Sequence, residues 1–279
     1  MNIHAAWHNA PLATDISRML IDIGANLTHS SFQTDLDEVL ARARDAGVNQ
    51  LVVTGADAQG SRDALALARQ HPSILYATAG VHPHHAKDFD SETESLLAEL
   101  HAMHEVVAVG ETGLDYHRNF SPREAQLFAF ERQLGLAIAC GKPLFLHQRD
   151  AHADFIACLD NVRGRIGRAV VHCFTGENDD LFDYLDRDCY IGITGWICDE
   201  RRGVHLRELV KHIPADRLML ETDAPYLLPR DLKPMPSHRR NEPMYLPHIA
   251  AEVARCRGED VATTAANATA AARTFFGLV

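Results

Sequence analysis

The chain has 279 residues, of which 46% are hydrophobic and 23% are charged, and its formal net charge is -11. This length suits one large barrel or two small domains, and the composition is that of an ordinary globular protein with a sizeable core. The acidic balance excludes attraction of nucleic acid by overall charge. Any contact with a polyanion has to be local, through metal ions or a basic patch.

Residues 1–18 show no hydrophobic period, and we expect them to form a disordered extension before a single domain over residues 19–279. The N-terminus lacks the basic-then-apolar pattern of a signal peptide, and no apolar run is long enough to span a bilayer. The six cysteines have no CxxC spacing, which favours buried free thiols in a reducing compartment. We therefore expect a cytoplasmic monomer without membrane contact.

After Met19, short β-branched runs alternate with amphipathic stretches of helical period. The runs predict eight strands, at residues 20–27, 50–54, 74–79, 106–111, 143–147, 169–172, 190–194 and 218–221. Helices are predicted between them, at residues 36–46, 122–140, 179–187, 206–211 and 246–257. Gly47 is a suitable stop for the first of these helices, and Ser121 with Pro122 is a suitable start for the second.

Alternating strands and helices imply a parallel sheet with right-handed crossovers. Eight repeats in roughly 250 residues favour a closed TIM (β/α)8 barrel. A doubly wound open sheet is the alternative, but it would need a glycine-rich phosphate loop, and neither a GxGxxG nor a Walker sequence is present. The proline-rich loop over residues 225–247 is long for a connection in a barrel, which predicts a functional role.

Groups that can bind a metal ion lie on or just after five of the predicted strands: Asp22, Asn26, Glu111, His147, His172 and Asp223. A single such group is more often a hydrogen-bonded structural residue. In a barrel, however, the C-terminal strand ends converge on one mouth, where several carboxylates would repel each other without a cation. The set therefore predicts a metal centre at that mouth.

A divalent metal lowers the pKa of a bound water and polarises the bond under attack, which is the chemistry of a hydrolase. Asp223 is placed both to touch a metal and to accept the proton of the water. A serine hydrolase would need a GxSxG sequence, which is absent. Cys173 follows His172, but neighbouring strand residues point to opposite faces, which disfavours a cysteine–histidine dyad.

Seven short segments, in this order, resemble motifs of the TatD family of metal-dependent deoxyribonucleases: DIGANL (22–27), AGVHPH (79–84), VGETGLD (109–115), HQRD (147–150), HCFTG (172–176), ETDAPY (221–226) and RRNEP (239–243). The segment GITGWICDERR (192–202) adds to the resemblance, which runs from about Met19 to the C-terminus. The resemblance implies a TIM barrel of the amidohydrolase-like superfamily that hydrolyses phosphodiester bonds.

The resemblance also implies roles for single residues. Glu111 would be a bridging metal ligand, and His147 and His172 would complete one metal site. Asp223 would serve a second metal and act as the general base. His82 resembles the histidine that faces the substrate phosphate, so catalytic roles fall to Asp223, Glu111 and His82.

Many members of the family begin with a His-x-His pair at the end of strand one, where this chain has Gly24 and Asn26. Strand alternation puts Asp22 on the same side, so Asp22 and Asn26 are predicted as weak oxygen ligands. Oxygen-rich sites suit Mg2+ and Mn2+, whereas imidazoles favour Zn2+. We expect one tight site, one weak site that fills with the substrate, and activity with Mg2+ or Mn2+, with Zn2+ as the alternative.

The long loop also carries the basic cluster of the sequence: Arg230, Lys233, His238, Arg239 and Arg240. This is either a solvated surface or a patch that grips phosphates, and Arg239 and Arg240, with His82, are the predicted phosphate contacts. The aromatic residues of the 116–120 loop either close that loop or stack on unpaired bases.

These patterns leave three hypotheses. The first is a metal-dependent exonuclease on single-stranded DNA, acting in DNA repair or degradation. The second is a metal-dependent hydrolase of small amides, esters or lactones, because the scaffold also supports that chemistry. The third is a binding protein without a metal, which the presence of Glu111, His147, His172 and Asp223 disfavours.

Overall fold

The computed structural model describes residues 19–278, and the predicted extension, residues 1–18, lies outside the described residues. Within the described range, eight strands form one parallel sheet whose spatial order is the order of the chain: β1 (Leu20–Ala25), β2 (Val48–Val53), β3 (Leu75–Ala79), β4 (Val106–Asp115), β5 (Leu144–Arg149), β6 (Ala169–Val171), β7 (Tyr190–Ile193) and β8 (Leu218–Leu220). A parallel bridge between Ala25 and Ala224 joins the end of β1 to the residues after β8 and closes the ring.

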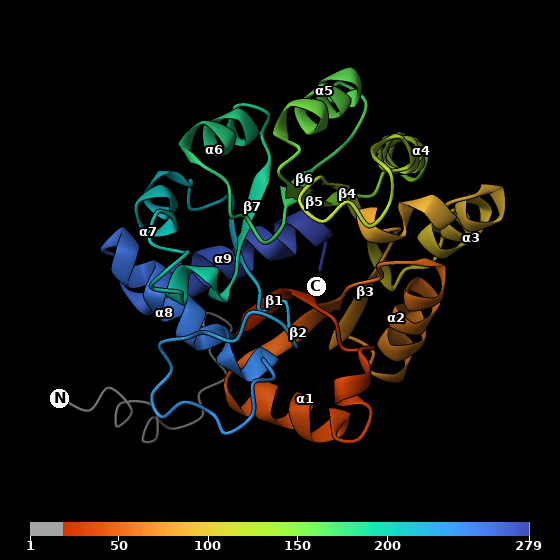
Figure 1. Ribbon diagram of the computed structural model, residues 1–279. Helices are drawn as coiled ribbons and strands as arrows, with labels where there is room; N and C mark the ends of the chain where they lie inside the picture. The colour runs from red at the N-terminus through yellow and green to blue at the C-terminus, as the bar shows by residue number, and fades with distance from the viewer. Residues whose placement is uncertain (1–18, 279) are drawn as a thin grey trace.

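The helices lie outside the ring of strands and alternate with them, which confirms the predicted TIM barrel (Figure 1). In the described part of the chain the α-helices are α1 (Leu36–Asp45), α2 (Ala58–Gln70), α3 (Ser91–His101), α4 (Arg123–Cys140), α5 (His152–Val162), α6 (Asn178–Leu185), α7 (Leu206–Leu209), α8 (Leu246–Arg257) and α9 (Val261–Phe276). Short 3-10 helices include η4 (Pro83–Asp88) and η5 (Gly195–Cys198). None of the helices in residues 19–278 is long and apolar enough to cross a membrane.

Local sequence explains where several helices begin and end. The side chain of Asp57 accepts a hydrogen bond from the backbone N–H of Gly60 at 2.7 Å and caps α2. The side chain of Asp90 caps α3 in the same way through Thr93. Gly47, with φ of 88°, follows α1 in the left-handed region, as expected for a glycine stop.

Two local predictions were wrong. The fourth strand does not end at Glu111, because β4 continues along β5 to Asp115 and buries all its residues. Ser121 does not cap α4, which begins at Arg123 after Pro122. The hydroxyl of Ser121 instead donates to the carbonyl of His84 at 2.9 Å, so it ties the α4 entry to η4.

A hydrophobic core fills the barrel towards the N-terminal ends of its strands. Ile23 of β1, Phe145 of β5 and Met219 of β8 belong to it, together with Phe275 of α9. The ring of Phe275 also contacts Tyr190, the first residue of β7, at 5.0 Å between centroids. Helix α9 lies against this end of the barrel (Figure 1). The buried polar residues Glu111 and His172 lie at the other end, where the strands finish.

Candidate active site

Three imidazoles surround one carboxylate oxygen at the C-terminal end of the barrel. Oε1 of Glu111 lies 2.7 Å from Nε2 of His172, 3.1 Å from Nδ1 of His147 and 3.3 Å from Nε2 of His82. Glu111 comes from β4 and His147 from β5, while His172 and His82 follow β6 and β3. The structure therefore brings together four of the residues singled out in the sequence.

Burial and charge set the protonation of this cluster. Burial alone raises the pKa of Glu111, but the nearby His82 and His172, with the His147 hydrogen bond, outweigh it and hold that pKa well below its usual value. Burial lowers the pKa of His82 to about 4. A buried carboxylate among imidazoles is thus kept ionised, which is the state that binds a cation.

The donor set fits a metal ion. One ligand atom each from His82, Glu111 and His147 can be chosen so that all lie within 4.8 Å of one another. Nε2 of His147 is buried and has no hydrogen-bond partner among the described residues. Two imidazoles, one of them with a nitrogen that makes no hydrogen bond, and a carboxylate are suitable ligands for a divalent transition metal. His82, predicted to face phosphate, thus also lies in ligand position.

Asp223 stands beside this cluster, directly after β8. Its Oδ1 accepts a hydrogen bond from Nδ2 of Asn26 at 3.0 Å, and its backbone N–H donates to the carbonyl of Gly24 at 2.8 Å. Its φ of 55° lies in the left-handed region, which is uncommon for a residue other than glycine and is typical of functional sites. Burial raises the pKa of Asp223 to about 7.

Glu221 is a site residue to which the sequence patterns assigned no role. It is fully buried, its Oε2 lies 3.2 Å from Nδ1 of His172, and its Oε1 accepts the backbone N–H of Cys173. A Cβ atom at Gly24 would come within 2.6 Å of Oε2 of Glu221, and one at Gly192 would collide with Oε1. Position 24 therefore has no room for the first histidine of a His-x-His pair.

Asp115 is a second residue that sequence reasoning left without a role. Its carboxylate lies 2.8 Å from Nε2 of His84 and 3.7 Å from Nε2 of His147. It also accepts the backbone N–H of Arg118 at 2.8 Å. Asp115 is the last residue of the VGETGLD motif. Its membership of that motif is the one feature of the sequence that could have marked it as a site residue. Asp115 thus lies at ion-pair distance from the same nitrogen of His147 that makes no hydrogen bond.

Asp22 was predicted as a weak metal ligand. Its carboxylate accepts hydrogen bonds from the backbone N–H groups of Gly24 and Thr222 and from the hydroxyl of Thr222. Burial raises the pKa of Asp22 to about 7. These contacts join β1 to the end of β8 and favour a structural role, and the ligand role stays a prediction.

Arg240 was predicted to grip phosphate, but acidic side chains surround it. Its guanidinium donates to Asp35 at 2.7 and 2.8 Å and to Glu242 at 2.7 Å. Arg42 contacts the same two carboxylates. These ion pairs lock the long loop to α1, so they favour a structural role for Arg240, whereas Arg239 is exposed. The phosphate role of both arginines stays a prediction.

Two aromatic residues of the loop after β4 differ in exposure, and the difference separates the two predicted roles, closing the loop and stacking on bases. Tyr116 is buried, and its hydroxyl donates to Asp154 of α5 at 2.7 Å, so it closes the loop. Phe120 is 62% exposed, and its ring centroid lies 4.7 Å from that of His84. An exposed ring next to the histidine cluster is available for stacking.

A cavity of about 340 Å³ lies at the same end of the barrel, between the end of β5 and the loop that follows β6. Its lining residues are Gln148, Arg149, Asp150, His152, Thr175, Gly176, Glu177 and Asp180. The guanidinium of Arg149 lies 5.8 Å from the ring of Trp196, and that of Arg202 lies 4.1 Å from the same ring. Cationic and aromatic groups thus flank the mouth on this side.

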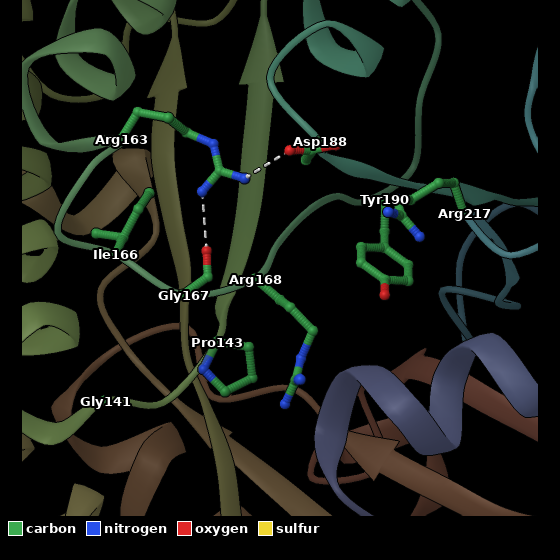
Figure 2. A pocket seen from close by; sticks show the side chains of 9 residues that line it. All are labelled: Gly141, Pro143, Arg163, Ile166, Gly167, Arg168, Asp188, Tyr190 and Arg217. Carbon is green, nitrogen blue, oxygen red and sulfur yellow. Dashed lines mark hydrogen bonds and ion pairs between the residues drawn. The ribbon is translucent and has the colours of Figure 1, made fainter.

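A larger cavity, of about 450 Å³, lies at the opposite end of the barrel (Figure 2). It is lined by residues at the starts of strands, such as Pro143 before β5 and Arg168 before β6. Figure 2 shows the side chain of Arg163 directed towards Gly167 and Asp188, with 3.0 Å to the carbonyl of Gly167. This cavity contains none of the predicted site residues.

The chain is similar to known proteins in both sequence and fold. A family model described as TatD related DNase matches residues 21–277. The 3'-5' ssDNA/RNA exonuclease TatD of Erwinia tasmaniensis is 52% identical over 259 residues, covering 93% of this chain and all of that protein.

The solved structure of YJJV, a TatD homologue of Escherichia coli K12, is 28% identical with a TM-score of 0.86, covering 95% of this chain and 100% of that one. A TatD family hydrolase of Entamoeba histolytica is 25% identical with a TM-score of 0.84, covering 94% and 99%. The chain therefore belongs to the TatD-related DNase family, as its motifs predicted.

Proposed function

We propose that this protein is a metal-dependent exonuclease that removes nucleotides from the 3′ end of single-stranded DNA and RNA. The observation that carries the proposal is the convergence of His82, His147 and His172 on one oxygen of Glu111 at the barrel mouth. The relative at 52% identity bears the name of a 3'-5' exonuclease on single-stranded DNA and RNA, which supports the polarity and the substrates.

The chain supplies ligands and a base in one place. Glu111, His82, His147 and His172 would hold a divalent metal, which when bound lowers the pKa of water and polarises the phosphodiester. Asp223 accepts the proton of the attacking water. Asn26 holds Oδ1 of Asp223 at 3.0 Å, which leaves Oδ2 to face that water.

We propose Mg2+ or Mn2+ as the activating ions, with a tight site at Glu111 and a weaker site near Asp223. Imidazole nitrogens around Glu111 bind Mn2+ and Zn2+ more strongly than Mg2+. Near Asp223 the donors are the oxygens of a carboxylate and an amide, which suit harder ions that keep several waters.

A single strand fits the surroundings of the cluster. Phe120 offers an exposed ring to unpaired bases, and Arg149 and Arg202, whose guanidinium groups lie over the ring of Trp196, offer cations to phosphates. Such local contacts are what a chain of net charge -11 needs for a polyanionic substrate. The reducing compartment expected for its six free cysteines supports a place in the cytoplasm.

The test is a panel assay with purified protein and added Mg2+, Mn2+ or Zn2+. We expect 5′-labelled single-stranded DNA to give a ladder that shortens from the 3′ end, and a 3′-blocked strand to be protected. Rapid hydrolysis of small esters or lactones without DNA cleavage would instead favour the second hypothesis. The Glu111→Gln variant, prepared in parallel, excludes a contaminating nuclease.

A further inference from the structure

A second group of potential metal ligands lies outside the Glu111 cluster. It consists of Cys198 at the end of η5, Asp231 in the long loop after β8, and His248 in the first turn of α8. One ligand atom from each can be chosen so that the three lie within 4.8 Å of one another. Three segments that are distant in the sequence thus present a thiol, a carboxylate and an imidazole to one point.

Two members of this group are in direct contact, and the third is buried beside them. Nε2 of His248 lies 2.7 Å from Oδ1 of Asp231, and the thiol of Cys198 is fully buried. The side chains of Asp231 and His248 are 40% and 33% exposed, so an ion can reach the group from solvent. Among the described residues, no hydrogen bond or ion pair connects these three side chains to Glu111 or to its histidines.

The surroundings of Cys198 are negative. Burial, the carboxylates of Asp231 and Glu252, and a hydrogen bond to Asp231 raise the pKa of the Cys198 thiol well above its usual value. A divalent cation reverses this situation, because the thiolate is the metal-binding form and the cation offsets the neighbouring carboxylate. The thiol therefore lies where it is a poor nucleophile and a suitable ligand.

The spacing fits a zinc-type ion. In tetrahedral coordination by sulfur, nitrogen and oxygen, ligand atoms lie roughly 3.5 Å apart. The separations in this group, from 2.7 Å to at most 4.8 Å, need side-chain adjustments of only about 1 Å to reach that spacing. Glu252, one turn after His248, is held by Arg207 at 3.2 Å and Arg255 at 2.7 Å, which leaves the fourth position to water.

We propose that Cys198, Asp231 and His248 bind a zinc-type divalent cation at a structural site separate from the catalytic centre. Bound there, the cation ties the loop after β8 to α8 and to the turn after β7. That loop begins beside Asp223 and contains Arg239 and Arg240, so the ion would fix the path of a long segment with little secondary structure. Its effect is on stability and loop order rather than on the chemical step.

Cobalt spectroscopy tests the proposal, because a thiolate bound to Co2+ gives an intense near-ultraviolet charge-transfer band. The Glu111 cluster has only imidazole and carboxylate donors, so it gives no such band. We expect the band when Co2+ is added to chelator-treated wild-type protein and to Glu111→Gln. It should disappear in Cys198→Ser and weaken in Asp231→Asn and His248→Ala.

Two cysteine variants serve as matched controls. Cys189→Ser changes another buried thiol, and Cys173→Ser changes the thiol next to His172. Both should keep the band. Absence of the band in wild-type protein, or its survival in folded Cys198→Ser, would overturn the proposal. If Cys198→Ser does not fold, full retention of the band in His248→Ala would overturn it equally.

Thermal unfolding gives an independent readout. In the Glu111→Gln background, Zn2+ at about 100 times its dissociation constant should raise the melting temperature by about 5–10 °C. The added substitution His248→Ala should remove most of that rise, while Cys189→Ser should leave it. An equal rise in the His248→Ala protein would show that the ion binds elsewhere.

Discussion

The carboxylate of Glu221 lies 3.2 Å from Nδ1 of His172, whose Nε2 faces Glu111 at 2.7 Å. His172 is therefore held between two buried carboxylates, one on each ring nitrogen. A carboxylate on the far nitrogen of a ligand histidine fixes the tautomer and the orientation of the ring. We propose that Glu221 positions the His172 ring in the metal centre.

We expect Glu221→Gln to weaken metal binding by about 10- to 100-fold, the usual cost of losing such a partner. A metal titration of nuclease activity checks this, and excess Mn2+ should restore much of the rate. Glu200→Gln, which changes an exposed glutamate, is the control. An unchanged metal dependence in Glu221→Gln would show that His172 needs no orienting partner.

Gly24→Ala should destabilise the fold by about 1–3 kcal/mol, because its Cβ would meet Oε2 of Glu221 at 2.6 Å in a closed barrel. Urea unfolding measures the change. Gly135→Ala, in α4 with nothing within 4 Å of the new Cβ, is the matched control and should stabilise by about 0.5–1 kcal/mol. Equal free energies of unfolding for Gly24→Ala and wild type would contradict the packing described for Glu221.

Asp223→Asn should lower kcat by about 10²- to 10⁴-fold, the range for a lost general base. Asn26→Ala should cause a smaller loss, because it removes only the hydrogen bond that orients Asp223. Both variants should keep most of their affinity for single-stranded DNA, measured with a non-cleavable strand. A wild-type kcat in Asp223→Asn would remove Asp223 from the reaction.

The sequence predicts more of the fold than of the site. All eight strands were predicted, because β-branched runs mark buried parallel strands wherever they pair. The end of β4 was missed because pairing with β5 decides it, and Glu111 gives no local sign of a continuing strand. Ser121 looked like a helix cap, but its hydroxyl found the carbonyl of His84 instead.

Within the site, the ligand types and their places on the strands predict Asp22, Asn26, Glu111, His147, His172 and Asp223 as a set. The structure brings Glu111, His147 and His172 into contact, and their roles as ligands stay a prediction. The roles of partner residues were not predictable in this way. Glu221 matters through its contact with His172, 49 residues earlier in the chain, and a sequence pattern does not encode such a distance. Arg240 looked free in a basic stretch, yet its partner Asp35 is 205 residues away.

Because Arg240 is held in ion pairs and Arg239 is exposed, we expect different effects when each is replaced by alanine. Arg240→Ala should lower the free energy of unfolding by about 1–3 kcal/mol, because it leaves Asp35 and the buried Glu242 short of a partner. Arg239→Ala should leave stability unchanged and, if the exposed Arg239 contacts phosphate, reduce the salt slope of DNA binding by about one. If the Arg240→Ala protein kept its stability but showed a reduced salt slope of DNA binding, Arg240 would have to contact phosphate after all.

The same ion pairs predict acid sensitivity. Hydrogen bonds from Arg240 lower the pKa of Asp35 from 3.8 to about 2. A carboxyl whose pKa is lower in the folded protein than in the unfolded chain stabilises the fold at every pH above the unfolded pKa. This contribution should therefore be lost as the pH falls from about 4 to 2. The difference in urea midpoint between wild type and Asp35→Asn should shrink over that range, and a constant difference would exclude the linkage.

The turnover of Glu111→Gln on 5′-labelled single-stranded DNA with saturating Mn2+ decides whether this carboxylate is needed for the proposed metal-dependent cleavage. Glutamine keeps the shape of the side chain but removes the charge on which three histidines converge. We expect a loss of about 10³-fold or more in kcat, in a protein whose circular dichroism spectrum and melting behaviour show an intact barrel. A folded Glu111→Gln protein that cleaves DNA at a near-wild-type rate would contradict it.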